Sequence, residues 1–265
     1  LSLGEGKRLV VEADEYDRSF LHLEPEMAAI TAMDNDHMDI YGTREAMLEA
    51  FAQFASQVRD GGALYLKRGL ELQGESASKA KVTGSYGVES GADYEARNLR
   101  VVNSQCMFDY YSPDCEMEGL CLGVPGRMNV ENVTVAITMA LKCGVTPQEI
   151  REALPNFKGV VRRFNVNAVS DAGVYVDDYA HHPEEIKATI NVAREVWPNS
   201  KLTIIFQPHL YTRTRDLYVD FAKSLSQADK VILTEIYPAR EVPIEGITSE
   251  IILDRPRCAK VLVEK

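Results

Sequence analysis

The sequence predicts an α/β protein with two domains. Short apolar runs that end in acidic residues, such as residues 8–13, are typical of buried parallel strands. Four alternating segments within residues 81–122 predict antiparallel strands joined by polar turns. From residue 165 onward strands and helices alternate, which predicts βαβ units and a second parallel sheet. Pro and Gly at residues 155–159 mark the boundary, so the predicted domains are residues 1–156 and 157–265.

The first domain is expected to contain three parallel strands and three helices besides its antiparallel segment. The strands are predicted at residues 8–13, 27–33 and 63–66. Residues 43–58 carry apolar side chains at helical spacing, with Thr43 as the expected N-cap and Gly61 and Gly62 after the end. Two further helices are predicted at residues 127–141 and 147–154.

The second domain is expected to alternate strands and helices. Strands are predicted at residues 165–169, 174–176, 202–206 and 230–234. Helices are predicted at residues 183–196 and 215–225, the first with Pro183 in its opening turn. Ligand groups of such a sheet gather at the carboxyl ends of its strands, so the residues after each strand are candidates for a site.

Charge and composition exclude several classes of protein. Lys and Arg number 29 and Asp and Glu number 40, a net charge of −11, which disfavours binding to nucleic acid or to an anionic membrane surface. The five Cys form no CxxC pair, which argues against zinc knuckles and a disulfide framework. No apolar run is long enough to span a bilayer, and the N-terminus does not resemble a signal peptide. We therefore expect a cytoplasmic protein. Both ends look cut, which suggests a fragment.

Two acidic clusters follow predicted strands in the first domain. One contains Glu12 and the other, at residues 34–39, contains His37. Carboxylates at two strand tips can hold Mg²⁺, which prefers oxygen ligands. A solvated acidic loop is the competing interpretation, and it is the more common outcome for a charge run.

Asn129 and Asn132 lie one turn apart at the start of the helix predicted at residues 127–141. Paired amides in this position can contact the edge of a heterocycle. Ordinary helix capping by Asn is equally compatible with the pattern.

The stretch VDDYAHHPEE at residues 176–185 is the densest group of polar residues. Pro183 and the two Glu that follow it are typical of a helix start, so the Glu pair is expected to be mostly structural. A metal site built on His181 and His182 is another possibility, although two adjacent side chains rarely bind the same ion. Arg163 precedes this stretch and Arg213 follows the strand at residues 202–206, and both suit phosphate or carboxylate recognition.

Seven motifs, taken together and in this order, resemble the Mur ligases. They are EADEYDRSFLHL, DNDHMDIYG, PGRMNVENVTVA, GVVRRF, DDYAHHPEE, FQPHLYTRTRD and TEIYPAREVPIEGITSE. Within the family they are most similar to the members that join L-alanine to UDP-N-acetylmuramate. A member that adds a recycled murein tripeptide to the same sugar nucleotide is the nearest alternative, and a non-catalytic nucleotide-binding module is a more distant one.

The resemblance implies a central ATPase-type domain followed by a Rossmann-like C-terminal domain, which use ATP and Mg²⁺ to form an amide through an acyl phosphate. By position, Glu12 and His37 match Mg²⁺ ligands, and Asn129 and Asn132 match adenine contacts. Arg163 matches the residue on the γ-phosphate and Asp178 matches the carboxylate on the ATP ribose. Tyr179, His181 and Arg213 match groups around the incoming amino acid and the reacting phosphate, with Arg213 as the candidate for the alanine carboxylate. The resemblance thus makes His181 and Arg163 the candidate catalytic residues.

The sequence departs from the family in ways that matter. No Gly-Lys-Ser or Gly-Lys-Thr occurs in these residues, so the phosphate loop of the family is not among them. The UDP-sugar domain of the family is not among them either. We therefore expect these 265 residues alone not to turn over ATP. No Lys lies between His37 and Lys67, which disfavours the ligases that act later and use a modified Lys there. Leu210 stands where many members have Arg, so carboxylate binding is left to Arg213, alone or with another group.

Overall fold

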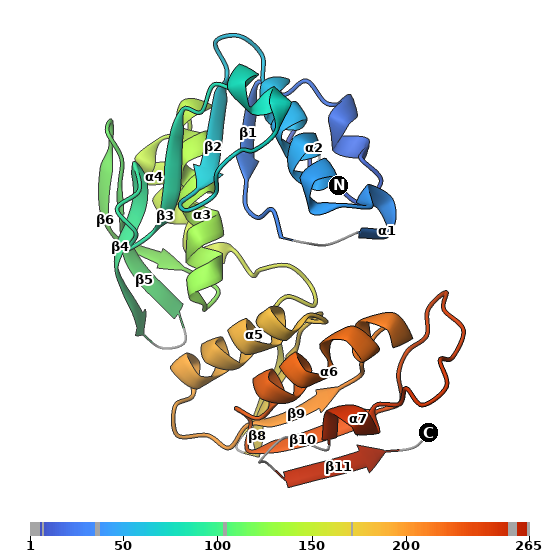
Figure 1. Cartoon of the computed structure of the whole chain (residues 1–265). Helices are drawn as coiled ribbons and strands as arrows, with labels where there is room; N and C mark the ends of the chain where they lie inside the picture. Colours follow the sequence, from blue (N-terminus) through green and yellow to red (C-terminus); the bar gives the residue numbers. More distant parts are fainter. Residues whose placement is uncertain are drawn as a thin grey trace. The chain divides into compact units, whose positions relative to one another are not determined.

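The computed structural model describes residues 6, 8–34, 38–102, 105–170, 172–253 and 259–263. The chain forms two compact units (Figure 1). The first comprises Leu1–Arg100, Met107–Leu120 and Met128–Glu152, and the second comprises Val101–Cys106, Cys121–Arg127 and Ala153–Lys265. The predicted boundary between residues 156 and 157 stays a prediction. No helix in the described part of the chain has both the length and the apolar character needed to cross a bilayer.

A six-stranded sheet, most of which belongs to the first unit, has the order β1-β2-β3-β4-β5-β6. Its strands are β1 (Met27–Ile30), β2 (Ala63–Lys67), β3 (Gly84–Val88), β4 (Tyr94–Val102), β5 (Gln105–Tyr111) and β6 (Glu116–Leu122). The helices of this region are α1 (Met38–Tyr41), α2 (Arg44–Ser56), α3 (Arg127–Lys142) and α4 (Pro147–Ala153), with 3-10 turns η1 (Ser19–His22), η2 (Glu75–Lys79) and η3 (Leu154–Asn156).

Helix α2 begins where the sequence predicts, because the Thr43 side chain accepts a hydrogen bond from the Ala46 N–H (3.2 Å). Its apolar face packs on β1 and β2 and forms a core with Phe20 of η1 (Figure 1). The Phe20 ring meets that of Phe51 edge to face, with centroids 5.4 Å apart. This core fixes the positions of β1 and β2.

Two expectations for this region are wrong. Residues 8–13 form no strand, and Leu9 and Val10 are 79% and 95% exposed. A parallel strand forms only by pairing with a neighbour, and no described strand pairs with this segment. The segment 81–122 is not wholly antiparallel either, since β3 pairs in parallel with both β2 and β4. The side-chain pattern of a strand records which faces are buried rather than its direction, and β3 is almost continuously buried, as parallel strands are.

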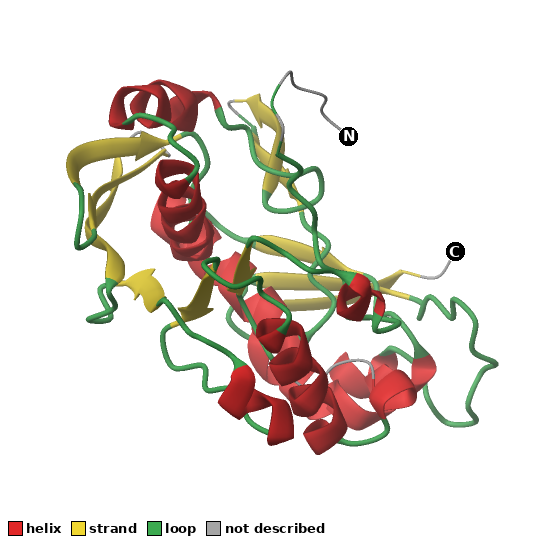
Figure 2. Cartoon of the chain, turned by 90° about the horizontal axis from the view of Figure 1, so that it is seen from above, coloured by secondary structure: helices red, strands yellow, loops and turns green. Residues whose placement is uncertain are grey.

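The second unit combines a hairpin with a parallel sheet. The hairpin is antiparallel and consists of β7 (Asn165–Ser170) and β8 (Gly173–Asp177). The sheet has the order β11-β10-β9, formed by β9 (Thr203–Phe206), β10 (Lys230–Thr234) and β11 (Ala259–Val263), and all of its pairings are parallel (Figure 2). The helices are α5 (Pro183–Val196), α6 (Tyr211–Leu225) and α7 (Glu250–Leu253). The predicted α/β class with a parallel C-terminal sheet is confirmed.

The core of the second unit lies between the sheet and its helices. Ile186 and Ile190 of α5 and Phe221 of α6 pack on Phe206 of β9 and Val231 of β10. Burying an aliphatic or aromatic side chain of this size contributes about 1.5–3 kcal/mol. The packing holds α5 and α6 side by side (Figure 1), so the segments that lead into the two helices, after β8 and β9, are neighbours.

Candidate active site at the ends of β8 and β9

A carboxylate directly after β8 fixes the segment that carries Arg163. Asp178 Oδ2 accepts a hydrogen bond from the Phe164 N–H (2.7 Å), and Oδ1 accepts one from the Ala180 N–H (2.7 Å). The Tyr179 N–H donates to the Arg162 carbonyl (2.8 Å). These bonds hold the residues before β7 against the end of β8. Asp178 and the exposed Arg163, which the resemblance assigns to two parts of ATP, are therefore close neighbours in the fold.

Five side chains form a continuous row beyond this clamp. The Arg162 guanidinium lies over the Tyr179 ring (4.7 Å), and the Tyr179 ring meets His181 edge to face (5.0 Å between centroids). His181 lies 6.3 Å from His209, which stacks on Tyr237 at 5.5 Å. We call these residues the ring row. It joins the ends of β8, β9 and β10, where parallel sheets place their ligand groups.

The orientation of His181 is set by the start of α5. The Nδ1 atom of His181 lies 2.8 Å from the Tyr179 carbonyl oxygen. The backbone N–H of His181 donates a hydrogen bond to Glu185 Oε2 (2.8 Å). The same oxygen accepts from the His182 N–H (3.1 Å), which completes a capping box. Glu185 is therefore structural, as predicted. In the described part of the chain, no three His, Cys, Asp or Glu side chains gather into a metal-binding group.

His209 and Arg213 bring a neutral ring and a cation together at the end of β9. Burial lowers the pKa of His209, and Arg213 and His181 lower it further. Its Nδ1 is buried and has no hydrogen-bond partner. The imidazole therefore stays neutral near pH 7 beside a permanent guanidinium charge. This arrangement suits the binding of an anion, because the positive charge comes from Arg213 and does not depend on protonation of His209.

Helix α6 starts four residues before the predicted position of residue 215. The cause is a cap from a distant part of the chain: the Glu241 carboxylate accepts from the Thr212 N–H (3.0 Å) and from the Thr212 hydroxyl. Arg213 thus lies in the first turn of α6 rather than in a strand-tip loop. The ring-row residues Arg162, His209 and Tyr237 and the cap residue Glu241 were not among the candidate residues. His209 and Tyr237 each closely follow a predicted strand, at residues 202–206 and 230–234, and His209 is noted in the sequence as a strand-tip residue without an assigned role.

The first unit holds the predicted adenine contacts. Asn129 and Asn132 lie in the first two turns of α3, half-buried and exposed respectively. Glu131, between them, pairs with Lys67 at the end of β2 (2.8 Å), so the start of α3 lies beside the carboxyl end of that strand. The start of α3, which carries both amides, therefore lies near the carboxyl end of a parallel strand, where such sheets bind ligands. Their contact with adenine stays a prediction.

The predicted Mg²⁺ ligands are less well defined. Glu12 is exposed in the irregular segment before η1 rather than at the tip of a strand. His37 lies outside the described residues. The shared role of Glu12 and His37 therefore stays a prediction.

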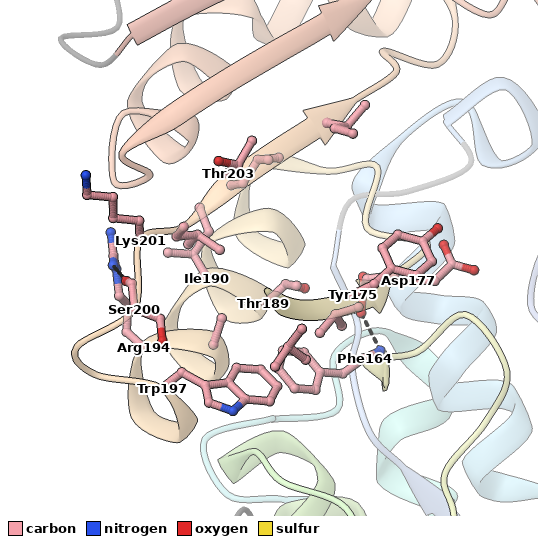
Figure 3. A pocket seen from close by; sticks show the side chains of 18 of the residues that line it. Phe164, Tyr175, Asp177, Thr189, Ile190, Arg194, Trp197, Ser200, Lys201 and Thr203 are labelled. Atoms are coloured by element: carbon pink, nitrogen blue, oxygen red, sulfur yellow. Dashed lines mark hydrogen bonds between the residues drawn. The ribbon is translucent and has the colours of Figure 1, made fainter. Parts of the chain in front are cut away.

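A cavity of about 900 Å³ lies beside the Asp178 clamp, between the hairpin, α5 and β9 (Figure 3). Phe164 and Trp197 stack at one end (6.1 Å, interplanar angle 17°), and Ile190 continues the apolar wall. Arg194, one helical turn before Trp197, lies near it with Lys201 and pairs with Asp229 (2.9 Å). The clamp hydrogen bond from Phe164 to Asp178 therefore also sets one wall of this cavity.

Family models match almost the whole chain. The Mur ligase middle domain matches residues 4–140, and the Mur ligase glutamate ligase domain matches residues 162–263. The chain belongs to the Mur ligases. The resemblance carried by the seven motifs is thereby confirmed.

Individual Mur ligases agree with this assignment. The UDP-N-acetylmuramate–L-alanine ligase of Phocaeicola vulgatus is 48% identical over 97% of the chain and 56% of its own length. That of Porphyromonas gingivalis is 46% identical over 93% of the chain and 54% of its length. The structure of UDP-N-acetylmuramate–alanine ligase from Thermotoga maritima matches with a TM-score of 0.76 and 26% identity, over 96% of this chain and 54% of that one. The chain thus spans about half the length of the relatives it matches.

Proposed function

We propose that these residues form the central and C-terminal parts of a bacterial, cytoplasmic ligase that joins L-alanine to UDP-N-acetylmuramate for peptidoglycan precursor synthesis. The support is the match to curated relatives of that name, at 45–48% identity in the first four. A murein peptide ligase from Psychrobacter arcticus matches with a TM-score of only 0.55 and 20% identity, which shows the fold alone.

The proposed reaction has two steps. The muramyl carboxylate attacks the γ-phosphorus of ATP, which forms an acyl phosphate and releases ADP. The amine of L-alanine then attacks the acyl carbon, and phosphate leaves as the amide forms. Catalysis of this kind depends on positioning and on neutralising phosphate charge. Arg163 and the Mg²⁺ ions, held by Glu12 and His37, are proposed to supply that neutralisation.

The remaining candidates are proposed to bind the substrates. Asn129 and Asn132 contact adenine and Asp178 contacts the ribose. Tyr179 and His181 line the space for the amino acid, and Arg213 binds its carboxylate. A charge-assisted bond to a guanidinium is the strongest recognition available for that group. The structural observation that supports the proposal best is the cluster of Arg213, neutral His209 and His181 after the carboxyl ends of β8 and β9.

Ligation by a full-length protein containing these residues tests the proposal. Phosphate release is followed with UDP-N-acetylmuramate, Mg–ATP and either L-alanine or murein tripeptide. We expect L-alanine to be preferred and Arg213→Gln to raise its KM. Arg215→Gln is the matched control, because Arg215 lies on the same helix but pairs with Asp216 (2.7 Å). A preference for tripeptide would overturn the substrate assignment, and nucleotide binding without ligation would indicate a non-catalytic module.

A further inference from the structure

Arg240 projects from a tight turn rather than from a loose loop. The Glu241 N–H donates to the Pro238 carbonyl (2.9 Å), which closes a four-residue turn. Ala239 within it has a φ of 49°, a left-handed conformation that a non-Gly residue adopts only when its surroundings impose it. The turn therefore fixes the backbone position from which the exposed Arg240 side chain extends.

The turn is attached on both sides to the connection between β9 and α6. On one side, the Tyr237 N–H donates to the Pro208 carbonyl (2.8 Å), and the Leu210 N–H donates to the Tyr237 carbonyl (2.9 Å). On the other side, the Glu241 carboxylate caps α6 through Thr212. Arg240 lies between these two anchors. It cannot move away from the start of α6 without breaking one of them.

The attachment brings a second guanidinium to the ring row. Arg240 also lowers the pKa of His209, although burial, Arg213 and His181 lower it more and Glu241 raises it, so both guanidiniums act on the same imidazole. Both oxygens of the neighbouring Glu241 accept hydrogen bonds from Thr212 at the helix start, so this carboxylate is held at the cap of α6. Leu210, at the centre of the connection, is apolar and offers no charge of its own. Two cations around one neutral ring form a place for an anion.

We propose that Arg240 is a second carboxylate-binding residue that holds the incoming amino acid together with Arg213. This inference rests on the proposed function and deepens it, because it identifies the α-carboxylate of the amino acid as the group that the two guanidiniums bind. Glu241 is the positioning residue: it holds the turn of Arg240 and the first turn of α6 in one arrangement. A substrate without a carboxylate loses both contacts at once.

Substrate kinetics with the full-length ligase test this assignment. Arg240→Gln should raise the KM for L-alanine by about tenfold, the loss expected for one charged hydrogen bond, with little change in kcat. Arg240→Lys should restore part of it, and the control Arg215→Gln should leave it unchanged. With L-alaninamide, which lacks the carboxylate, Arg240→Gln and the parent should have the same KM. A KM for L-alanine equal to that of the control, or an equal loss with the amide, overturns the proposal.

A measurement without substrate separates this proposal from the proposed function. In NMR titrations of the 265-residue chain, Arg240→Gln should raise the pKa of the His209 imidazole, because a neighbouring cation is removed, whereas Arg215→Gln should not. An unchanged pKa overturns the placement of Arg240, whatever the enzyme ligates. If the ligase uses a different carboxylate-bearing amine, the proposed substrate is wrong, and the same comparison of acid and amide decides the role of Arg240.

Discussion

Replacing Asp178 by Ala tests whether one carboxylate holds the segment of Arg163 to the end of β8. The substitution removes the acceptors of the Phe164 and Ala180 N–H groups, each at 2.7 Å. A hydrogen bond to a charged group contributes about 1.5–3 kcal/mol, and the lower value applies here because Asp178 is only half-buried. Two such bonds give a loss of about 3 kcal/mol. Asp178→Asn keeps one acceptor oxygen and should lose about half as much.

Urea unfolding followed by Trp197 fluorescence measures this loss. Trp197 is the only Trp in the sequence, and it stacks on Phe164, the residue whose N–H the carboxylate holds. With a slope of about 1.5 kcal/mol per molar urea, a loss of about 3 kcal/mol lowers the midpoint by about 2 M. The native emission should also change, because Phe164 is released from its clamp.

Asp177→Ala is the matched control, since Asp177 is the adjacent residue of the same type and its side chain makes none of the clamp bonds. It should move the midpoint by about 0.3 M, as surface substitutions do. Equal shifts for the two Ala variants, or an unchanged native emission in Asp178→Ala, would refute the assignment of Asp178 as the clamp.

Three further predictions concern α5, His209 and nucleotide turnover. Glu185→Gln weakens the capping box and should cost about 1 kcal/mol, or roughly 4 °C in Tm by calorimetry, whereas exposed Glu184→Gln should not. The pKa of His209 lies below its ordinary 6.5, so the unfolded state takes up the proton first as pH falls; stability should drop below pH 6.5, and His209→Gln should flatten this dependence in urea midpoints measured at pH 5.5 and 7.5. The 265 residues alone, which contain no Gly-Lys-Ser or Gly-Lys-Thr, should show no alanine-dependent phosphate release in a coupled assay.

The sequence predicts those features that depend on local pattern. The Thr43 cap and the start of α5 at Pro183 agree with the structure, because their signals lie within a few residues of one another. The segment 8–13 fails for the opposite reason. Its apolar pattern fits a strand, but a strand also needs a partner that the pattern does not specify.

The same distinction applies to the site. Tyr179 and His181 lie in one motif, and the structure places them in contact. Arg213 is placed by Glu241, whose carboxylate accepts a hydrogen bond from Thr212, 29 positions earlier in the chain. Neither periodicity nor local capping rules could reveal that bond, and α6 was therefore predicted to start too late. Long-range polar contacts of this kind become visible only when the fold is known.

The acidic residues of the second unit explain how a chain with a net charge of −11 can build a site for anions. In the sequence, the resemblance makes Asp178 a candidate for binding the ATP ribose, whereas Glu185 is expected to be structural and Glu241 has no assigned role. In the structure, each carboxylate accepts hydrogen bonds from backbone N–H groups and fixes a segment. The side chains that they position are neutral rings and guanidiniums, so a chain that is acidic overall presents cations suited to phosphate and carboxylate at the ends of β8 and β9.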